Sequence, residues 1–296
     1  MAYRLISIFA FSLIFGGCSS TPQFYQPKTS TLQTLQQADY APKNLAIAFG
    51  GGGVRGFVHL GAIKALHEAG IKADLATGSS IGALVAALYA SGKSYQEIEK
   101  MAFALEDADI VEFAPQTLGL LAHQDIAVWI EQQIGHSQIE HLAIPLGVSV
   151  TQLNKRQALL ITEGSLGKAI QASTTVPGTF VPLASAESIW LDGGVLNNLP
   201  VRFAKALGAK HVIAIDIYCG KQQYIADNAF RILLASSRLQ SCALAKPDQQ
   251  LADILIQPNF EPKNPTNFSE RESAIEAGYQ ATLALLPKIK QLLAKP

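Results

Sequence analysis

The order of apolar and polar positions predicts strands and helices that alternate along most of the chain. Short, mainly apolar runs such as residues 45–49 (LAIAF) are typical of strands buried on both faces of a parallel sheet. Segments with a helical repeat follow them, beginning with 54–69, which ends at Gly70. The same patterns predict strands at 73–77, 146–152, 157–161, 188–191, 211–217 and 251–256, and helices at 82–90, 165–172, 200–207 and 229–244.

Helix boundaries are marked most clearly by capping residues. Ser94 with Glu97 forms a capping box, and Ser269 with Glu272 is expected to open a long C-terminal helix. Residues 107–141 are predicted to be helical but looser, with Gly119 and Gly135 as breaks. Strands that alternate with helices indicate an α/β fold with a parallel sheet covered on both faces.

The first 18 residues have the pattern of a secretion signal. Arg4 precedes an apolar stretch at 5–15, whose eleven residues are too few to span a bilayer, since a span needs about 20. Small residues then lead to Cys18, an order that resembles a bacterial lipoprotein signal, in which Cys18 becomes the lipidated first residue of the mature chain. Plain secretion with cleavage nearby is the alternative. Ser19 after the cysteine points to an outer-membrane lipoprotein of the bacterial cell envelope, facing the periplasm.

Residues 19–43 differ in composition from the rest of the chain. They are rich in Ser, Thr, Gln and Pro and have little apolar periodicity. We expect a flexible tether there, with a short helix near Leu32. A globular domain at 44–296 follows from the patterning beyond it.

Composition excludes several classes of protein. Only 16% of the 296 residues are charged, which excludes a disordered chain or a coiled coil. Lys plus Arg balance Asp plus Glu at 23 each, which argues against a nucleic-acid partner. Three cysteines are too few for a disulfide scaffold or a zinc site. After Cys18, the other two, Cys219 and Cys242, are left either as a disulfide or as two free buried thiols.

A glycine-rich loop, residues 51–56 (GGGVRG), follows the first predicted strand. It fits the G-x-G-x-x-G fingerprint of dinucleotide-binding proteins, and Asp74 lies 18 residues beyond Gly56, where such proteins carry an acidic residue. An oxidoreductase is therefore one interpretation. The same backbone N–H groups, aimed outward at a helix N-terminus, could instead hold an oxyanion, and a plain glycine turn is the third alternative.

A second motif, residues 78–82 (GSSIG), lies between a predicted strand and a helix of small residues. This is the context of a nucleophile elbow, a sharp turn that exposes Ser80 at a helix N-terminus. Gly78 and Gly82 make room where Cβ atoms would clash. A nucleophilic serine needs a base, and none of the six histidines stands in an obvious position for one.

Asp192, the first residue of D-G-G at 192–194, is the better candidate for the base. It follows a strand and should reach the same sheet edge as Ser80, although an ordinary Asp-Gly turn is the alternative interpretation. A carboxylate within hydrogen-bond reach could accept the serine proton directly.

Taken together and in this order, the three motifs resemble the patatin-like phospholipases, most of all the compact bacterial members, over roughly residues 44–286. The resemblance implies a three-layer α/β/α sandwich with a mainly parallel sheet, related to cytosolic phospholipase A2. It implies a Ser80–Asp192 dyad without histidine, metal or cofactor. Residues 172–178 (ASTTVPG) also resemble a segment beside the active site, although Thr175 departs from the commoner small residues.

The remaining motif positions receive supporting roles by the same resemblance. Oxyanion-hole N–H groups are expected from Gly51, Gly52 and Gly53, and Arg55 orders the loop or adds positive charge. The resemblance disfavours the dinucleotide interpretation, because that interpretation predicts neither a serine elbow nor D-G-G. The other supporting positions are Gly56, Gly78, Gly82, Gly193 and Gly194.

The function implied is a serine acyl hydrolase of the phospholipase A or lysophospholipase type, acting on phospholipid or lysophospholipid at a membrane surface. An esterase for small soluble esters and a catalytically idle, lipid-binding envelope protein of the same fold are the alternatives. Residues 96–141 could form a lid or the acyl-chain wall, or simply part of the core. The sequence leaves headgroup, chain length and oligomeric state open.

Overall fold

The computed structural model describes residues 24–105, 112–116, 118–220, 227–263 and 268–294. Within these residues, eight strands form one sheet in the order β11-β10-β1-β2-β5-β9-β8, with β6 paired to β5. Neighbours from β11 to β5 run parallel, whereas β6, β8 and β9 pair antiparallel. The strands are β1 (Lys43–Phe49), β2 (Leu75–Ser79), β5 (Leu146–Gln152), β6 (Gln157–Ile161), β8 (Leu183–Ala184), β9 (Ile189–Asp192), β10 (Ala209–Ile215) and β11 (Ile254–Ile256).

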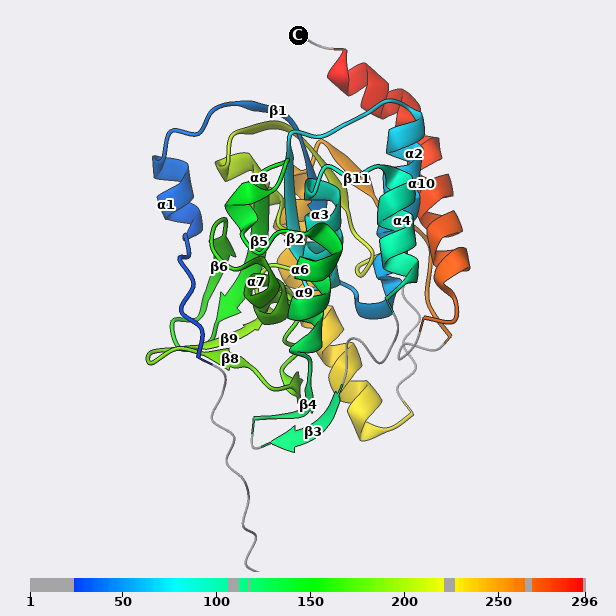
Figure 1. The fold of residues 1–296 in the computed structure, drawn as a ribbon. Helices are drawn as coiled ribbons and strands as arrows, with labels where there is room; N and C mark the ends of the chain where they lie inside the picture. The colour runs from blue at the N-terminus through cyan, green and yellow to red at the C-terminus, as the bar shows by residue number, and fades with distance from the viewer. Residues whose placement is uncertain (1–23, 106–111, 117, 221–226, 264–267, 295–296) are drawn as a thin grey trace, which may run out of the picture.

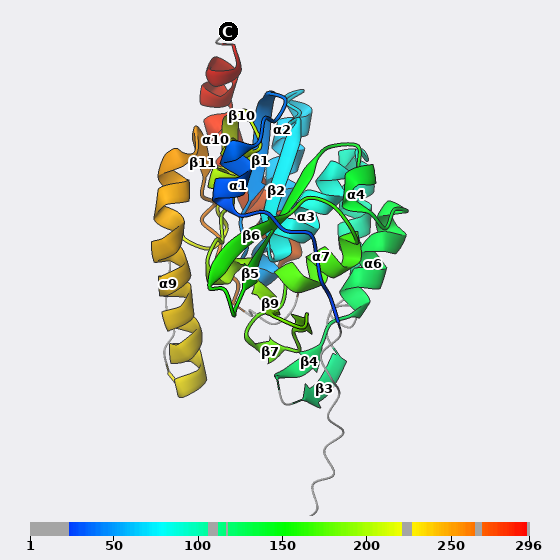
Figure 2. The same cartoon turned by 90° about the vertical axis from the view of Figure 1, so that its left-hand side faces the viewer.

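Helices cover both faces of this sheet, and Figure 2 shows α9 on one side of the strands with α4 and α6 on the other. The three-layer α/β/α arrangement predicted from the sequence is therefore confirmed. A short 3₁₀ turn, η1 (Gly53–Gly56), leads into the first long helix, and others lie at η2 (Ile139–His141) and η3 (Gly193–Val195). The helices are α1 (Leu32–Gln37), α2 (Phe57–Glu68), α3 (Ile81–Ala90), α4 (Tyr95–Phe103), α6 (Asp125–Ile134), α7 (Leu166–Ser173), α8 (Val201–Ala206), α9 (Ala229–Leu251) and α10 (Arg271–Leu293).

Alternation along β1 divides the apolar core into two layers. Leu45, Ile47 and Phe49 face the core formed with α2, α3, α4, α6, α7 and α10. Ala46 and Ala48 face the smaller core beneath α1, α8 and α9. Because successive side chains of a strand point to opposite faces, a continuous apolar run is what a sheet covered on both sides requires.

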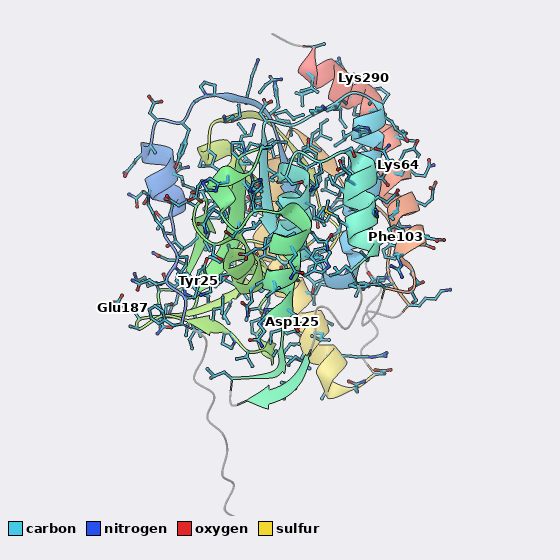
Figure 3. All side chains as sticks on the ribbon, in the orientation of Figure 1. Tyr25, Lys64, Phe103, Asp125, Glu187 and Lys290 are labelled. Carbon is cyan, nitrogen blue, oxygen red and sulfur yellow. A yellow bond between two sulfur atoms is a disulfide. The ribbon has the colours of Figure 1, made fainter. Side chains whose placement is uncertain are left out.

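The described part of the segment predicted to be a flexible tether packs against the domain over residues 24–37. Tyr25 is buried, labelled in Figure 3, and its carbonyl accepts a hydrogen bond of 3.0 Å from Trp190 Nε1. Leu35 of α1 lies in the smaller core, and Ser30 pairs with Leu160 of β6. Residues 24–37 thus pack on the domain because Tyr25 and Leu35 find apolar partners there. The predicted signal at 1–18 lies outside the described residues.

The described part of residues 107–141 is less helical than predicted. Glu112–Gln116 (β3) and Gly119–Ala122 (β4) form an antiparallel pair, which β7 (Gly178–Phe180) extends into a second, three-stranded sheet. Among the described residues of this segment, those of α6 form a helix of the expected kind. The C-terminal helix has Glu270, and not Ser269, at its N-cap position, and the Glu270 side chain makes no capping hydrogen bond. No helix in the described ranges is long and apolar enough to cross a bilayer.

The two remaining cysteines form a disulfide. Cys219 follows β10 and Cys242 lies in α9, with their Cα atoms 5.3 Å apart. The disulfide joins α9 to the loop that follows β10. The sequence leaves open whether these cysteines form a disulfide or remain free thiols, and the structure shows the disulfide.

Helices α2 and α10 approach each other through glycines. A Cβ atom at Gly61 would overlap the Ile275 carbonyl oxygen, and one at Gly278 would overlap that of Val58. Lys64, which is labelled in Figure 3, stands over the Tyr279 ring with its Nζ 5.0 Å from the ring centroid. The close packing of α2 and α10 therefore depends on glycine, which has no side chain, at positions 61 and 278.

We expect Gly61→Ala to lower the free energy of unfolding by about 2–3 kcal/mol, because the added methyl group forces the two helices apart. At a helix position with no close neighbour, the same Gly→Ala change would instead raise the free energy of unfolding by roughly 1 kcal/mol. Urea unfolding measures the difference, with Ser273→Ala on the exposed face of α10 as the control. A stabilised Gly61→Ala variant would contradict the packing described here.

Candidate active site

Ser80 stands at the sharp turn between β2 and α3. Its backbone has φ 54° and ψ −131°, a conformation that costs a residue with a side chain about 1–3 kcal/mol. The Ser80 N–H donates a 2.9 Å hydrogen bond to Ser173 Oγ, and Ser173 Oγ donates one of 2.7 Å to the Ser149 carbonyl. These bonds hold the strained turn, as a nucleophile elbow requires.

The two glycines that flank the elbow are needed for close approach. A Cβ atom at Gly78 would overlap the backbone of Gly82 and Ala83, and one at Gly82 would overlap the carbonyl oxygens of Phe49 and Gly50. Any side chain here would push α3 away from β1. The predicted roles of Gly78 and Gly82 in making room therefore agree with the structure.

Strand β5 brings Asp192 to this turn. Along β5, Ser149 is in register with Ser79 of β2, and Val150 is in register with Asp192 of β9. The Ser80 Oγ donates a hydrogen bond of 2.6 Å to Asp192 Oδ2. Two residues that are 112 positions apart in the sequence thus form a direct serine–carboxylate pair.

The environment of Asp192 favours a proton acceptor that works near neutral pH. Burial raises the pKa of its carboxyl group to about 6, even though hydrogen bonds from Ser80 and the Gly194 N–H act in the opposite direction. The Gly194 N–H lies 2.6 Å from Oδ1, and the Asp192 N–H donates to the Thr175 carbonyl at 2.8 Å. At pH 7 the carboxylate is mainly ionised and able to take the serine proton.

No histidine among the described residues is hydrogen-bonded to Ser80 or Asp192. His123 is buried, and its Nε2 donates to the Gln171 carbonyl at 3.0 Å beside Thr175 Oγ1. Burial lowers its pKa to about 4, so the ring is neutral. His59 likewise contacts the Gly50 carbonyl at 2.8 Å. His123 and His59 thus make these hydrogen bonds to backbone carbonyls away from the Ser80–Asp192 pair.

The glycine-rich loop borders the same pair, with one difference from the prediction. The Gly51 N–H already donates a 3.0 Å hydrogen bond to the Asn198 carbonyl, so it is not available to an oxyanion. Gly52 and Gly53 line the cavity around Ser80 and open η1, where the first N–H groups of a helical turn have no partner within it. These two remain as the candidate donors.

Asn198 is a site residue that the sequence analysis missed. Its side-chain amide donates to the Gly51 carbonyl at 3.2 Å, so that Asn198 holds the loop through both backbone and side chain. Ser173, which supports the elbow, was also missed as an individual residue. For Asn198 the sequence offers only a short polar stretch in apolar surroundings, and such a stretch does not reveal that its partner, Gly51, lies 147 positions away.

Arg55 is buried and orders the loop. Its Nη1 donates to the Gly52 carbonyl at 3.1 Å, and its Nη2 is paired with Glu261. Glu261 is also bound by Arg238 at 3.0 Å. Burial would raise the pKa of Glu261, but the two arginines outweigh it and hold that pKa below its usual value. Of the two predicted roles, loop ordering has structural support, whereas the charge of Arg55 is offset by Glu261.

The serine–carboxylate pair opens into a cavity of about 280 Å³. Gly194 lines it, Gly193 packs against the Ser149 carbonyl, and Gly56 lies against Ile81. The rim carries Val176 of the 172–178 segment and Leu234 of α9. Over the described part of the chain, no cluster of His, Cys, Asp or Glu could hold a metal ion.

A second, wholly apolar crevice meets this cavity at Gly53. Leu105 and Trp129, both from the segment predicted to be a lid or acyl-chain wall, line it together with Phe57. Its free volume of about 20 Å³ is room for little more than a water molecule. The crevice can take an acyl chain only if its helices part, so these two residues lie in the core of the structure as it stands.

We expect Asp192→Asn to stabilise the fold at neutral pH. The raised pKa means that the folded protein keeps a proton on Asp192 that the unfolded chain releases, so the native carboxylate loses stability as pH rises from about 4 to about 6. A neutral amide avoids this loss, which corresponds to at most about 3 kcal/mol above pH 6. Urea unfolding at pH 4 and pH 7.5 measures it, and an equal stability change at both pH values would contradict the burial argument.

Comparisons with known proteins bear on this arrangement. The chain is 33% identical over 183 residues to Patatin-like phospholipase domain-containing protein 6 of Homo sapiens, covering 58% of this chain and 13% of the relative. It is 33% identical over 182 residues to Lysophospholipase NTE1 of Chaetomium globosum, covering 59% and 12%. The chain thus spans about an eighth of the length of these relatives. Among solved structures, VipD from Legionella pneumophila aligns with a TM-score of 0.48 at 15% identity, over 93% of this chain and 72% of that one.

The family match is broader than the individual motifs. Residues 47–205, more than half of the chain, match the sequence profile of the family described as Patatin-like phospholipase. The matched stretch contains the glycine-rich loop, the serine elbow and the D-G-G turn that meet in the cavity. The chain therefore belongs to the patatin-like phospholipase family.

Proposed function

We propose that this protein hydrolyses acyl ester bonds of phospholipids or lysophospholipids, with Ser80 as nucleophile and Asp192 as general base. The observation that carries the proposal is the 2.6 Å hydrogen bond from Ser80 Oγ to Asp192 Oδ2, at the wall of an open cavity. A buried serine that donates to a carboxylate of raised pKa is poised for proton transfer.

The reaction proceeds by two acyl transfers. Asp192 accepts the Ser80 proton as Oγ attacks the ester carbonyl, and the N–H groups of Gly52 and Gly53 stabilise the oxyanion. One such donor is worth about 2.7–4 kcal/mol in a well-studied hydrolase. Protonated Asp192 then gives its proton to the leaving alcohol. Water then attacks the acyl-enzyme while Asp192 takes the water proton, and Asp192 returns that proton to Ser80 Oγ as the fatty acid leaves.

Lipid esters are favoured as substrates by the family and by the rim of the cavity. One relative is named a lysophospholipase. Val176 and Leu234 give the rim apolar side chains that suit an acyl chain better than a small polar ester. An esterase for small soluble esters would have the same pair, and a series of acyl-chain lengths separates the two.

The predicted location completes the proposal. Cys18 carries a lipid anchor that holds the mature chain at the bacterial outer membrane, facing the periplasm. The disulfide Cys219–Cys242 supports an oxidising compartment, since such bonds persist outside the reducing cytosol. Mass spectrometry of the membrane fraction tests the anchor, and an unmodified Cys18 would count against it.

We expect Ser80→Ala and Asp192→Asn each to lower fatty-acid release by at least about a thousandfold, because they remove the nucleophile and its base. Release from phosphatidylglycerol, phosphatidylethanolamine and their lyso forms is the measurement, which also identifies the preferred headgroup. Ser137→Ala, an exposed serine on the loop after α6, is the matched control and should keep full activity.

Two results would count against this assignment. Release that survives in Ser80→Ala would remove Ser80 from the role of nucleophile. Wild-type protein that releases no fatty acid from any lipid or short-chain ester would favour the idle lipid-binding alternative.

The dependence of activity on pH should report Asp192. We expect kcat/KM to fall about tenfold per pH unit below about pH 6, because a protonated carboxyl group cannot accept the serine proton. A soluble short-chain ester avoids titration of lipid headgroups. A profile that stays level well below pH 6 would show that Asp192 is not the base.

A further inference from the structure

The first part of α9 projects beyond the body of the domain. The buried residues of this helix are Arg238, Ser241, Ala245 and Asp248, whose spacing of three or four places them on one face. No described side chain of residues 229–237 is buried. At 1.5 Å per residue this overhang is about 13 Å long. Figure 1 shows it in yellow at the lower end of the molecule.

The overhang carries apolar side chains exposed to solvent. Ile232, Leu233 and Leu234 are consecutive, with exposed fractions of 52%, 65% and 44%. Successive helical residues point about 100° apart, so these three cover much of the circumference of the helix. Isolated apolar residues on a surface need no explanation, but a contiguous group marks a site of interaction.

Further exposed apolar residues lie at the same end. Leu118 and Leu120 belong to the turn and strand that follow β3, and β4 pairs with β7, the strand that begins two residues after Val176. Val176 and Leu234 are both on the rim of the cavity that contains Ser80. Figures 1 and 2 agree in placing the start of α9 and the β3–β4 pair at the lower end. The apolar docking face is thus formed by Leu118, Leu120, Val176, Ile232, Leu233 and Leu234.

We propose that the apolar docking face inserts into the surface of a lipid bilayer and sets the mouth of the Ser80 cavity against it. The proposal extends the proposed function, because it names a direct contact with the bilayer in addition to the lipid anchor. A helix end that carries exposed apolar side chains is suited to the boundary between lipid headgroups and acyl chains.

The position of the N-terminal chain supports a bilayer as the occupant. Phe24, the first described residue, pairs with Ala184 of β8 and is itself 62% exposed. Cys18 precedes it by six residues, which reach at most about 20 Å when extended. A lipid on Cys18 would therefore keep the β8 side of the lower end near the membrane, the same end that carries the docking face.

Charge on the overhang also fits an uncharged surface. Arg231 and Asp227 at the start of α9 pair with each other at 3.1 Å, so this ion pair adds no net charge. We therefore expect binding to depend on apolar insertion, with little effect of anionic lipid or of salt.

Contacts further along α9 connect the docking face with the site. Ser241 Oγ donates a 2.9 Å hydrogen bond to the Gly194 carbonyl, within the turn that carries Asp192. Arg238 binds Glu261 together with Arg55 of the glycine-rich loop, and Cys242 is joined to Cys219. Because the helix is held at these points, insertion of its free end fixes the orientation of the cavity.

The test uses Leu233→Asp, with Leu251→Asp as the matched control. Leu251 is similarly exposed, at 46%, but lies at the opposite end of the same helix. Residues 24–294 contain all the described elements in one packed unit, so a chain that begins at Ser19 tests the face without the anchor. Binding to phosphatidylcholine vesicles is measured by flotation in the Ser80→Ala background, which prevents turnover of the lipid.

We expect Leu233→Asp to weaken binding to vesicles by at least about tenfold, since a charged group must leave water to insert. Leu251→Asp should bind as the parent does, and equal binding to vesicles with added phosphatidylglycerol is expected. With Ser80 restored, Leu233→Asp should still cleave a soluble short-chain ester at the parental rate, which shows that the variant is folded.

Other outcomes would overturn the proposal. Parent protein that fails to float, while it cleaves soluble esters, removes the docking face and leaves the proposed hydrolase standing. Parent protein that floats but hydrolyses nothing removes the proposed function and leaves the docking face. If light scattering shows a dimer that Leu233→Asp dissociates without loss of vesicle binding, the face binds a second copy of the chain instead of a bilayer.

Discussion

The pairing of β5 with two different strands is the constraint on which the site depends. Residues 148–152 of β5 pair with β6 along one edge, so β2 and β9 must share the other edge. Strand β2 ends at Ser79, and β9 takes its place from the next position onward. The end of one strand therefore delivers Ser80, and the end of the other delivers Asp192, to the same point. Loss of this register by one residue would turn the Asp192 side chain to the opposite face of the sheet.

The surrounding structure is built to keep this point compact. Ser80 occupies a strained backbone conformation, and Asp192 is a buried carboxyl group, both of which are unfavourable in isolation. The Ser80 N–H donates to Ser173 Oγ, the Asp192 N–H donates to the Thr175 carbonyl, and the Gly194 N–H donates to the Asp192 carboxylate, which compensates in part. Glycines at the elbow allow α3 to approach β1. Such local costs are found where groups must be held ready for reaction, and here they coincide with the only buried serine–carboxylate hydrogen bond among the described residues.

Helix α9 joins this site to the surface of the molecule. Asp248 near its C-terminal end is fully buried and binds Arg202 and Asn197 next to the site. Its middle is tied to Gly194 and Cys219, whereas no described side chain of residues 229–237 is buried and Leu234 lines the cavity. One element thus has a rigid half that supports the reacting groups and an exposed half that can meet a partner. The β3–β4 pair, which the sequence did not reveal, is joined to β7, and β7 begins two residues after Val176 in the wall of the cavity.

The sequence by itself determined the alternation of strands and helices, because buried strands and amphipathic helices have different apolar periods. It also determined the three motifs and the identity of Ser80 and Asp192 as candidates, since glycine spacing reflects local backbone requirements. Short strands such as β3 and β4 escaped prediction because their partners, and not their own periodicity, stabilise them. Whether Gly51 is free, whether Cys219 pairs with Cys242, and how burial shifts the pKa of Asp192 depend on residues far away in the chain. Only the tertiary structure decided these points, because contacts and desolvation arise when distant segments pack together.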